Sequence, residues 1–186
     1  MRLFIAIELP DGIKRAIAAV QEELRKAGAD ASWTRPEGIH LTLKFLGDAP
    51  DAKVPAITAA LAAAVREATR FRLDVAGAGA FPNSKNPRVL WVGVRGDAAK
   101  LAAVQASVER AMAGLEFEPE DRPFSPHLTL ARIKYLRPRF SWQQAIEGIK
   151  DASLGGFDVT AVSLMKSELK PSGAVYTELS RVELKQ

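Results

Sequence analysis

The chain contains two histidines, His40 and His127, and each one opens the tetrapeptide HLTL. The ordinary pKa of imidazole lies close to neutral pH, so a pair of histidines can supply one proton donor and one proton acceptor. Alternate side chains of a strand share a face, which places Thr42 beside His40 and Thr129 beside His127. A threonine hydroxyl can hydrogen-bond an anionic oxygen. The repeated H-x-T pattern therefore predicts acid–base chemistry on a bound anion, in preference to two unrelated core histidines.

The two motifs belong to a longer repeat. RPEGIHLTL begins at Arg35 and RPFSPHLTL at Arg122, so the offset is 127 − 40 = 87 for the histidines and 122 − 35 = 87 for the arginines. Phe71 and Phe157 are separated by 157 − 71 = 86 residues. We infer an internal duplication over nearly the whole chain, with no long linker between the halves.

Hydrophobic periodicity predicts alternating strands and helices. Strands are expected at 3–8, 40–47, 71–76, 89–94, 127–130, 157–164 and 175–184, and helices at 13–24, 54–65, 101–112 and 142–149. Asp11 is expected to cap the first helix, 77–87 to form a loop and 171–173 a turn. The expected fold is α+β, a single bilobal domain over residues 1–186. Two largely antiparallel sheets would surround a central cleft, with helices outside. A pseudo-two-fold axis would bring the HLTL strands together across this cleft.

Composition limits the classes of function. The chain has no cysteine, which excludes disulfides and thiolate chemistry. The N-terminal apolar run is too short for a signal peptide, and no stretch approaches the length of a membrane span, so a cytoplasmic monomer is expected. A net charge of +4 mildly favours a polyanionic partner such as RNA, although a merely basic surface explains it about as well. The sequence has neither HExxH nor GxxxxGK[ST], so we expect no metal, no cofactor and no P-loop.

Two related histidines suit in-line displacement at phosphorus. The nucleophile enters on one side and the leaving oxygen departs on the other, so a base and an acid are needed on opposite sides. The two threonines would hold the non-bridging oxygens between them. This chemistry requires no metal, because protein donors stabilise the charge.

The chain resembles the 2H phosphoesterase superfamily, which carries two H-x-[ST]-x motifs. Within it, the chain is similar to the RNA 2′,3′-cyclic phosphodiesterases, historically called 2′-5′ RNA ligases. The matching segments are MRLFIAIELP, HLTLKFLGD, FPNSKNPRVLWVGV, SPHLTLAR and GAVYTELS. The resemblance implies hydrolysis of an RNA 2′,3′-cyclic phosphate to a 2′-phosphate, and a reversible 2′-5′ ligation in some members. It makes His40 the proton donor, His127 the proton acceptor, and Thr42 and Thr129 phosphate ligands.

Two further residues are weaker candidates. Arg132 follows the second motif as an arginine does in this family, but strict strand alternation would point it away from the motif face. Phe45 could stack a base, although core packing is the commoner role of a phenylalanine beside an apolar strand. A non-catalytic module that binds RNA ends or cyclic nucleotides is the main alternative, and the intact pair of histidines argues against it.

Overall fold

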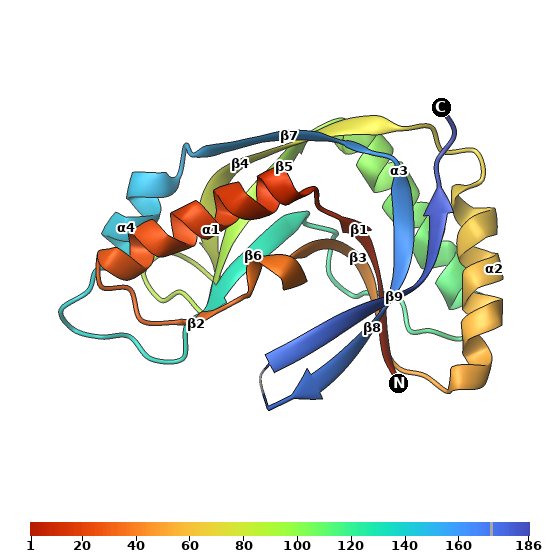
Figure 1. The fold of residues 1–186 in the computed structure, drawn as a ribbon, viewed down its shortest axis with the longest axis horizontal. Helices are drawn as coiled ribbons and strands as arrows, with labels where there is room; N and C mark the ends of the chain where they lie inside the picture. Colours follow the sequence, from red (N-terminus) through yellow and green to blue (C-terminus); the bar gives the residue numbers. More distant parts are fainter. Residues whose placement is uncertain (172) are drawn as a thin grey trace.

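The computed structural model describes residues 1–171 and 173–186, and it contains two antiparallel sheets with helices outside (Figure 1). The four-stranded sheet has the order β3-β1-β8-β9 and the five-stranded sheet the order β2-β6-β5-β4-β7. The strands are β1 (Arg2–Glu8), β2 (Ser32–Trp33), β3 (His40–Asp48), β4 (Phe71–Phe81), β5 (Val89–Gly96), β6 (His127–Arg132), β7 (Ser153–Val159), β8 (Ala161–Lys170) and β9 (Gly173–Glu183). This is the predicted α+β fold.

The helices divide between the sheets. They are α1 (Asp11–Lys26), α2 (Val54–Val65), α3 (Ala98–Ala113) and α4 (Trp142–Ile149), with short 3₁₀ turns η1 (Pro36–Gly38) and η2 (Asp51–Lys53). The helix α1 contacts β7 and α4 contacts β4, whereas α3 contacts β3 and α2 contacts β9 (Figure 1). Apolar residues at helical spacing, such as Ile13, Ile17 and Leu24 of α1, enter the core. No helix of the described residues is long and apolar enough to cross a membrane.

The two halves of the chain exchange strands. The strand β4 follows α2 in the first half, yet it pairs with β5 and β7 in the five-stranded sheet. The strand β8 belongs to the second half, yet it pairs with β1 in the four-stranded sheet. With β2 in the five-stranded sheet and β9 in the four-stranded sheet, each sheet contains two strands from the other half.

Two predictions about where elements begin and end are wrong, and a third cannot be compared with the structure. The single strand expected at 157–164 is two strands, because the chain leaves β7 after Val159 and enters the other sheet as β8 at Ala161. Asp11 is the first residue of α1, and the extended Pro10 occupies the N-cap position. The expected turn at 171–173 contains residue 172, which lies outside the described residues.

The segment 77–81 was expected to be loop and instead continues β4. A bulge near Gly77, whose φ is +77°, separates the part of β4 that pairs with β7 from the part that pairs only with β5. The indole of Trp91 lies against Gly79, where a side chain would overlap it. The small residues that resemble a loop in the sequence therefore serve close packing within the sheet.

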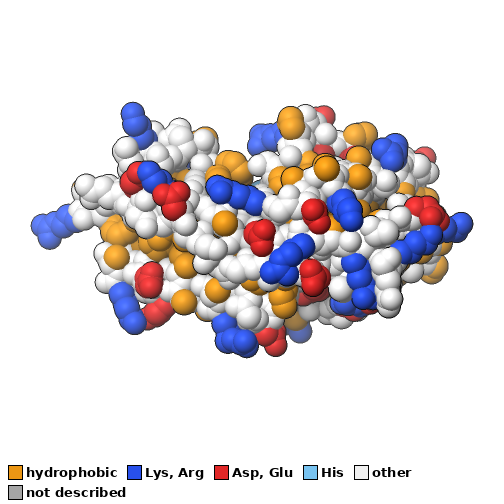
Figure 2. All heavy atoms as spheres, turned by 90° about the horizontal axis from the view of Figure 1, so that it is seen from above, with side chains coloured by type: hydrophobic (Ala, Val, Ile, Leu, Met, Phe, Trp, Pro, Cys, Tyr) orange, Lys and Arg blue, Asp and Glu red, His pale blue; other side chains and the backbone are white. Residues whose placement is uncertain are grey.

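Charges are interspersed on the surface. On the face drawn in Figure 2, lysine and arginine side chains alternate with aspartate and glutamate. The net charge of +4 is thus not gathered on this face.

Candidate active site

The two HLTL strands lie in contact with each other, one from each sheet. The strand β3 starts at His40 and β6 starts at His127, and the two strands touch. The histidine of each motif is aligned with a residue of the neighbouring strand: His40 with Glu8 of β1, and His127 with Gly93 of β5. Each histidine is thus the first residue of its strand, and strand pairing holds its backbone in place. The strand β3 is at the edge of its sheet, whereas β6 lies between β2 and β5.

Both imidazoles are held by the same hydrogen bond. The Nδ1 of His40 lies 2.7 Å from the carbonyl oxygen of Gly38, and the Nδ1 of His127 lies 2.7 Å from that of Ser125. A carbonyl oxygen only accepts, so Nδ1 carries the hydrogen in both rings. In the neutral ring Nε2 is then the free base, and in the charged ring it is the acid. The backbone two residues earlier thus fixes which nitrogen of each histidine is available for chemistry.

Each imidazole contacts aromatic rings edge-on, two at His40 and one at His127. The ring of His40 meets Phe4 and Tyr176 edge-on, with centroids 5.2 and 4.6 Å away. The ring of His127 meets Phe81 edge-on at 5.0 Å, and Phe81 also contacts Trp91. These contacts restrict the rotation of the imidazoles and lower the local polarity.

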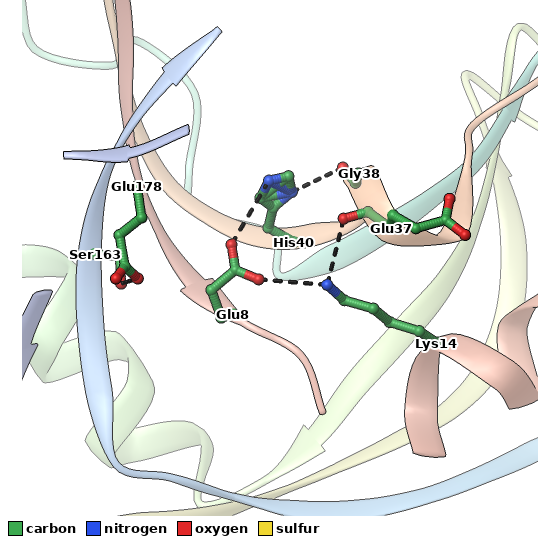
Figure 3. Close-up of polar contacts among 7 residues, drawn as sticks. All are labelled: Glu8, Lys14, Glu37, Gly38, His40, Ser163 and Glu178. Atoms are coloured by element: carbon green, nitrogen blue, oxygen red, sulfur yellow. Dashed lines mark hydrogen bonds and ion pairs between the residues drawn. The ribbon is translucent and has the colours of Figure 1, made fainter. Parts of the chain in front are cut away.

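Their electrostatic surroundings differ. The Nε2 of His40 lies 3.8 Å from an oxygen of Glu8, whose other oxygen lies 3.4 Å from Lys14 Nζ (Figure 3). Burial lowers the pKa of His40 below its ordinary value, the negative charge of Glu8 raises it, and the positive charge of Lys14 lowers it. Because burial dominates, His40 is mainly neutral at neutral pH in the free protein. His127 is half-buried and forms no ion pair within the described part of the chain.

A β-bulge follows the threonine in both motifs. On β3, Thr42 pairs with Ala6 and Lys44 with Ile5, so Leu43 is the extra residue. On β6, Thr129 pairs with Trp91 and Ala131 with Leu90, so Leu130 is the extra residue. The bulges occupy equivalent positions, since 130 − 43 = 87. Two consecutive side chains point into the core at each bulge: Leu43 with Lys44, and Leu130 with Ala131.

The bulges reverse the alternation of side chains and so place Phe45 and Arg132. Both residues are exposed, on the face that carries the histidine and threonine of their own motif. Phe45 is 67% exposed, and its ring lies 6.2 Å from that of Phe4, which also contacts His40. The expectation that Phe45 packs in the core is therefore wrong. The parity objection to Arg132 also fails, because it assumed an unbulged strand.

A glutamine from a helix supports each bulge, and no local sequence pattern distinguishes either glutamine. Gln21 of α1 is fully buried and donates to the carbonyl oxygens of Leu130 (2.9 Å) and Thr34 (2.8 Å). Gln105 of α3 lies 3.4 Å from the carbonyl oxygen of Leu43. Each helix thus contacts the bulge of the motif in the opposite half, and Gln21 also ties that bulge to the segment that leads into His40.

Lys44 and Glu109 form a second link behind the first motif. The nearly buried ammonium of Lys44 lies 2.6 Å from Glu109 Oε1 and donates to the carbonyl of Glu118 at 2.8 Å. Glu109 also accepts the backbone N–H of Glu120. The strand β3 is thereby joined to the loop that precedes His127. Movement of the loop away from β3 would leave the buried charge of Lys44 without its partner, which is costly. The pair therefore stabilises the position of the loop.

The threonine hydroxyls are available for a ligand. Thr42 and Thr129 are half-buried, and neither hydroxyl has a hydrogen-bond partner within residues 1–171 and 173–186. The same part of the chain contains no group of three or more His, Cys, Asp or Glu residues able to hold a metal ion. The two motifs thus carry two imidazoles and two hydroxyls, and Arg132 adds a guanidinium, which are groups that can bind an anion.

Comparison with known proteins decides the family. The family model described as "LigT like Phosphoesterase" matches the chain twice, at residues 7–91 and 92–176. The chain belongs to the LigT-like phosphoesterase family. The double match agrees with the internal repeat inferred from the sequence, and the recognition of the 2H phosphoesterase pattern is confirmed.

Curated LigT-like relatives cover almost the same length. An RNA 2′,3′-cyclic phosphodiesterase of Methanothermobacter thermautotrophicus is 34% identical over 179 residues, which are 96% of each chain. One from Thermus thermophilus is 33% identical and covers all of this chain and 91% of the relative. Among crystal structures, TT0787 of Thermus thermophilus matches with a TM-score of 0.79 and 32% identity, over 100% of this chain and 98% of that one. Escherichia coli LigT complexed with 3′-AMP matches with a TM-score of 0.75 and 28% identity, with the same coverage.

Proposed function

We propose that the protein hydrolyses RNA 2′,3′-cyclic phosphate ends to 2′-phosphates without a metal, and that the same site can join RNA ends through a 2′-5′ linkage. The observation that carries the proposal is the matched presentation of two Nε2 atoms, one from each H-x-T motif, by identical Nδ1–H···O=C hydrogen bonds. The names of the relatives support this choice of substrate. The nucleotide bound to E. coli LigT supports a nucleotide-binding site in the shared fold.

The two histidines divide the proton transfers. Nε2 of neutral His127 removes a proton from water, and the resulting hydroxide attacks phosphorus. Nε2 of charged His40 protonates the 3′ oxygen as the P–O3′ bond breaks. The phosphate stays on the 2′ oxygen, and the two histidines exchange protonation states.

The lowered pKa of His40 has a direct consequence for this assignment. His40 must carry a proton when the substrate reacts, although burial keeps it mainly neutral in the free protein. The negative charge of the cyclic phosphate acts in the same direction as Glu8 and raises the pKa of His40. Substrate binding and protonation of His40 are therefore linked.

The remaining residues bind the substrate. The hydroxyls of Thr42 and Thr129 donate to the non-bridging oxygens, whose charge they stabilise in the transition state. Arg132 approaches the phosphate from the exposed end of the second motif. Phe45 offers an open aromatic face to a base.

The decisive experiment uses an oligoribonucleotide that ends in a 2′,3′-cyclic phosphate. With chelator present, the product should be a 2′-phosphate, assigned by phosphorus NMR, and His40→Ala should abolish turnover. A 3′-phosphate product, or activity that chelator removes, would contradict the mechanism. Binding of this RNA without turnover would instead establish the non-catalytic alternative.

A further inference from the structure

A hollow of about 270 Å³ lies beside the second motif and is not used by the hydrolytic mechanism. Its lining includes Trp91, Gly93, Arg95, Pro126 and Lys150. Pro126 directly precedes His127, and Gly93 is aligned with His127 across β5 and β6. The hollow is therefore adjacent to His127, the proposed base that removes a proton from the attacking water.

Its position in the sheet gives it access to the motif face. Trp91 and Gly93 pair with Thr129 and His127. Directly paired residues of neighbouring strands project to the same face of a sheet, so these two lie on the face that carries the second motif. Glycine at 93 allows the backbone of β4 to approach closely, since a side chain there would lie 2.8 Å from the carbonyl oxygen of Ala76.

The chemistry of the lining suits a nucleotide. Arg95 and Lys150 bring two positive charges, and Arg95 has no ion-pair partner among the described residues. Lys150 is paired with Glu147 at the surface. The indole of Trp91 is part of the lining and supplies an aromatic surface. The volume is slightly smaller than that of sites for drug-sized ligands, which suits one nucleoside with its phosphate.

We propose that this hollow receives the 5′-terminal nucleoside of an RNA strand with a free 5′-hydroxyl, the strand that replaces water in ligation. This inference rests on the proposed function. The base of that nucleoside lies beside Trp91, and Arg95 and Lys150 neutralise its first internucleotide phosphate. Its 5′-hydroxyl then takes the position of water next to His127.

The ligation step balances without a cofactor. The 5′ oxygen forms a bond to phosphorus as the P–O3′ bond breaks. His127 takes the proton of the 5′-hydroxyl, and His40 gives a proton to the 3′ oxygen. The product is a 2′-5′ phosphodiester with a free 3′-hydroxyl. One P–O ester bond, to the 3′ oxygen, is exchanged for another, to the 5′ oxygen, so no external source of energy is needed.

The test measures ligation and hydrolysis in one reaction. An RNA ending in a 2′,3′-cyclic phosphate is incubated with a second RNA that bears a 5′-hydroxyl, and ligated and hydrolysed products are separated by length and charge. Each exposed contact between a cation and a phosphate changes affinity by about threefold, so Arg95→Gln with Lys150→Gln should lower the ligation-to-hydrolysis ratio about tenfold. Arg66→Gln with Arg70→Gln, two exposed residues that follow α2, removes the same number of positive charges elsewhere and should leave the ratio unchanged.

A strand that cannot react provides a second measurement. An RNA whose 5′ carbon lacks the hydroxyl should inhibit hydrolysis by excluding water, and the double variant should weaken this inhibition about tenfold. An unchanged ratio and unchanged inhibition in the double variant would overturn the proposal. Brisk hydrolysis by the natural sequence with no ligated product would overturn both this proposal and the ligation part of the proposed function, and would leave the hydrolytic part standing. Absence of hydrolysis itself would be a failure of the proposed function.

Discussion

Glu8 and Lys14 place opposite charges beside the imidazole of His40, so their removal should change catalysis in opposite directions. The pKa of His40 is already lowered by burial, and Glu8→Gln removes the group that raises it. If His40 donates a proton, its protonated fraction at neutral pH limits kcat/KM, which then falls in Glu8→Gln. Lys14→Gln removes a group that lowers the pKa, so the protonated fraction rises.

The size of the effect follows from the distance. Two unit charges 4 Å apart interact by about 1 kcal/mol in water and about 4 kcal/mol near a protein surface. Glu8 lies 3.8 Å from Nε2, its side chain is 29% exposed, and it also contacts Lys14, so the lower part of this range applies. We take about 1.4 kcal/mol, which is a tenfold change in the protonated fraction. A stronger acid is also a better donor, which reduces the expected change in rate to roughly threefold to tenfold.

Glu8 also repels an anionic substrate. The assay must therefore separate the effect of Glu8 on the protonation of His40 from its effect on substrate binding. A cyclic substrate with sulfur in place of the 3′ oxygen provides the reference, since a thiolate leaves without full protonation. The ratio of kcat/KM for the oxygen substrate to that for the sulfur substrate should fall threefold to tenfold in Glu8→Gln at neutral pH. It should rise in Lys14→Gln.

The charge control is Glu23→Gln on the exposed face of α1, which should leave this ratio unchanged. An unchanged ratio in Glu8→Gln, together with an acid limb of the pH profile displaced to lower pH, would mean that His40 accepts the proton. The assignment of the two histidines would then be reversed.

Three further predictions concern the motifs and their support. Thr42→Val and Thr129→Val should each cost about 1–3 kcal/mol of transition-state binding with unfolding by urea unchanged, as measured by kcat/KM; wild-type turnover in both would exclude the phosphate role. The sulfur substrate should restore much of the activity of His40→Ala and little of that of His127→Ala; rescue of His127→Ala alone would exchange the two roles. Gln21→Met should lower the free energy of unfolding by about 1–3 kcal/mol because the carbonyl of Thr34 loses its buried donor, and kcat should fall more than KM changes; a loss of stability with normal kcat would restrict Gln21 to a structural role.

The motifs and most elements could be predicted from the sequence because they rest on local patterns. In a regular strand, His40 and Thr42 lie on one face and Leu41 on the other. The strand β3 is regular from His40 to Thr42, so this part of the prediction needs no tertiary information. The helix of Ile13, Ile17 and Leu24 is visible in the spacing of its apolar residues. These features require no knowledge of distant contacts.

The exposure of Phe45 and Arg132 could not be read from the sequence, because a bulge depends on the register of the neighbouring strand. One extra residue reverses every side chain that follows it. The repeat did contain a signal, since Phe45 and Arg132 differ by 132 − 45 = 87 and therefore share one environment. Glu8 meets His40 only through strand pairing, and no local pattern indicates that.

The crossing at Thr160 was missed for a related reason. Val159 and Ala161 are both buried, so the apolar run reads as one strand. The change of sheet becomes visible only when β7 is seen beside β4 and β8 beside β1. Such choices between sheets are made by tertiary packing, which overrides local preference.

The exchange of β4 and β8 also bears on how the enzyme moves. Enzymes built from two separately folded lobes often close around a substrate by rotation about a short linker. Here the chain crosses between the two sheets four times, from β1 to β2, from β2 to β3, from β3 to β4 and from β7 to β8, so a rotation of one sheet against the other would have to bend all four connections at once. We therefore expect the spacing of the two histidines to be preset by the scaffold. Turnover would then be governed by chemistry and by local loop motion, without domain closure.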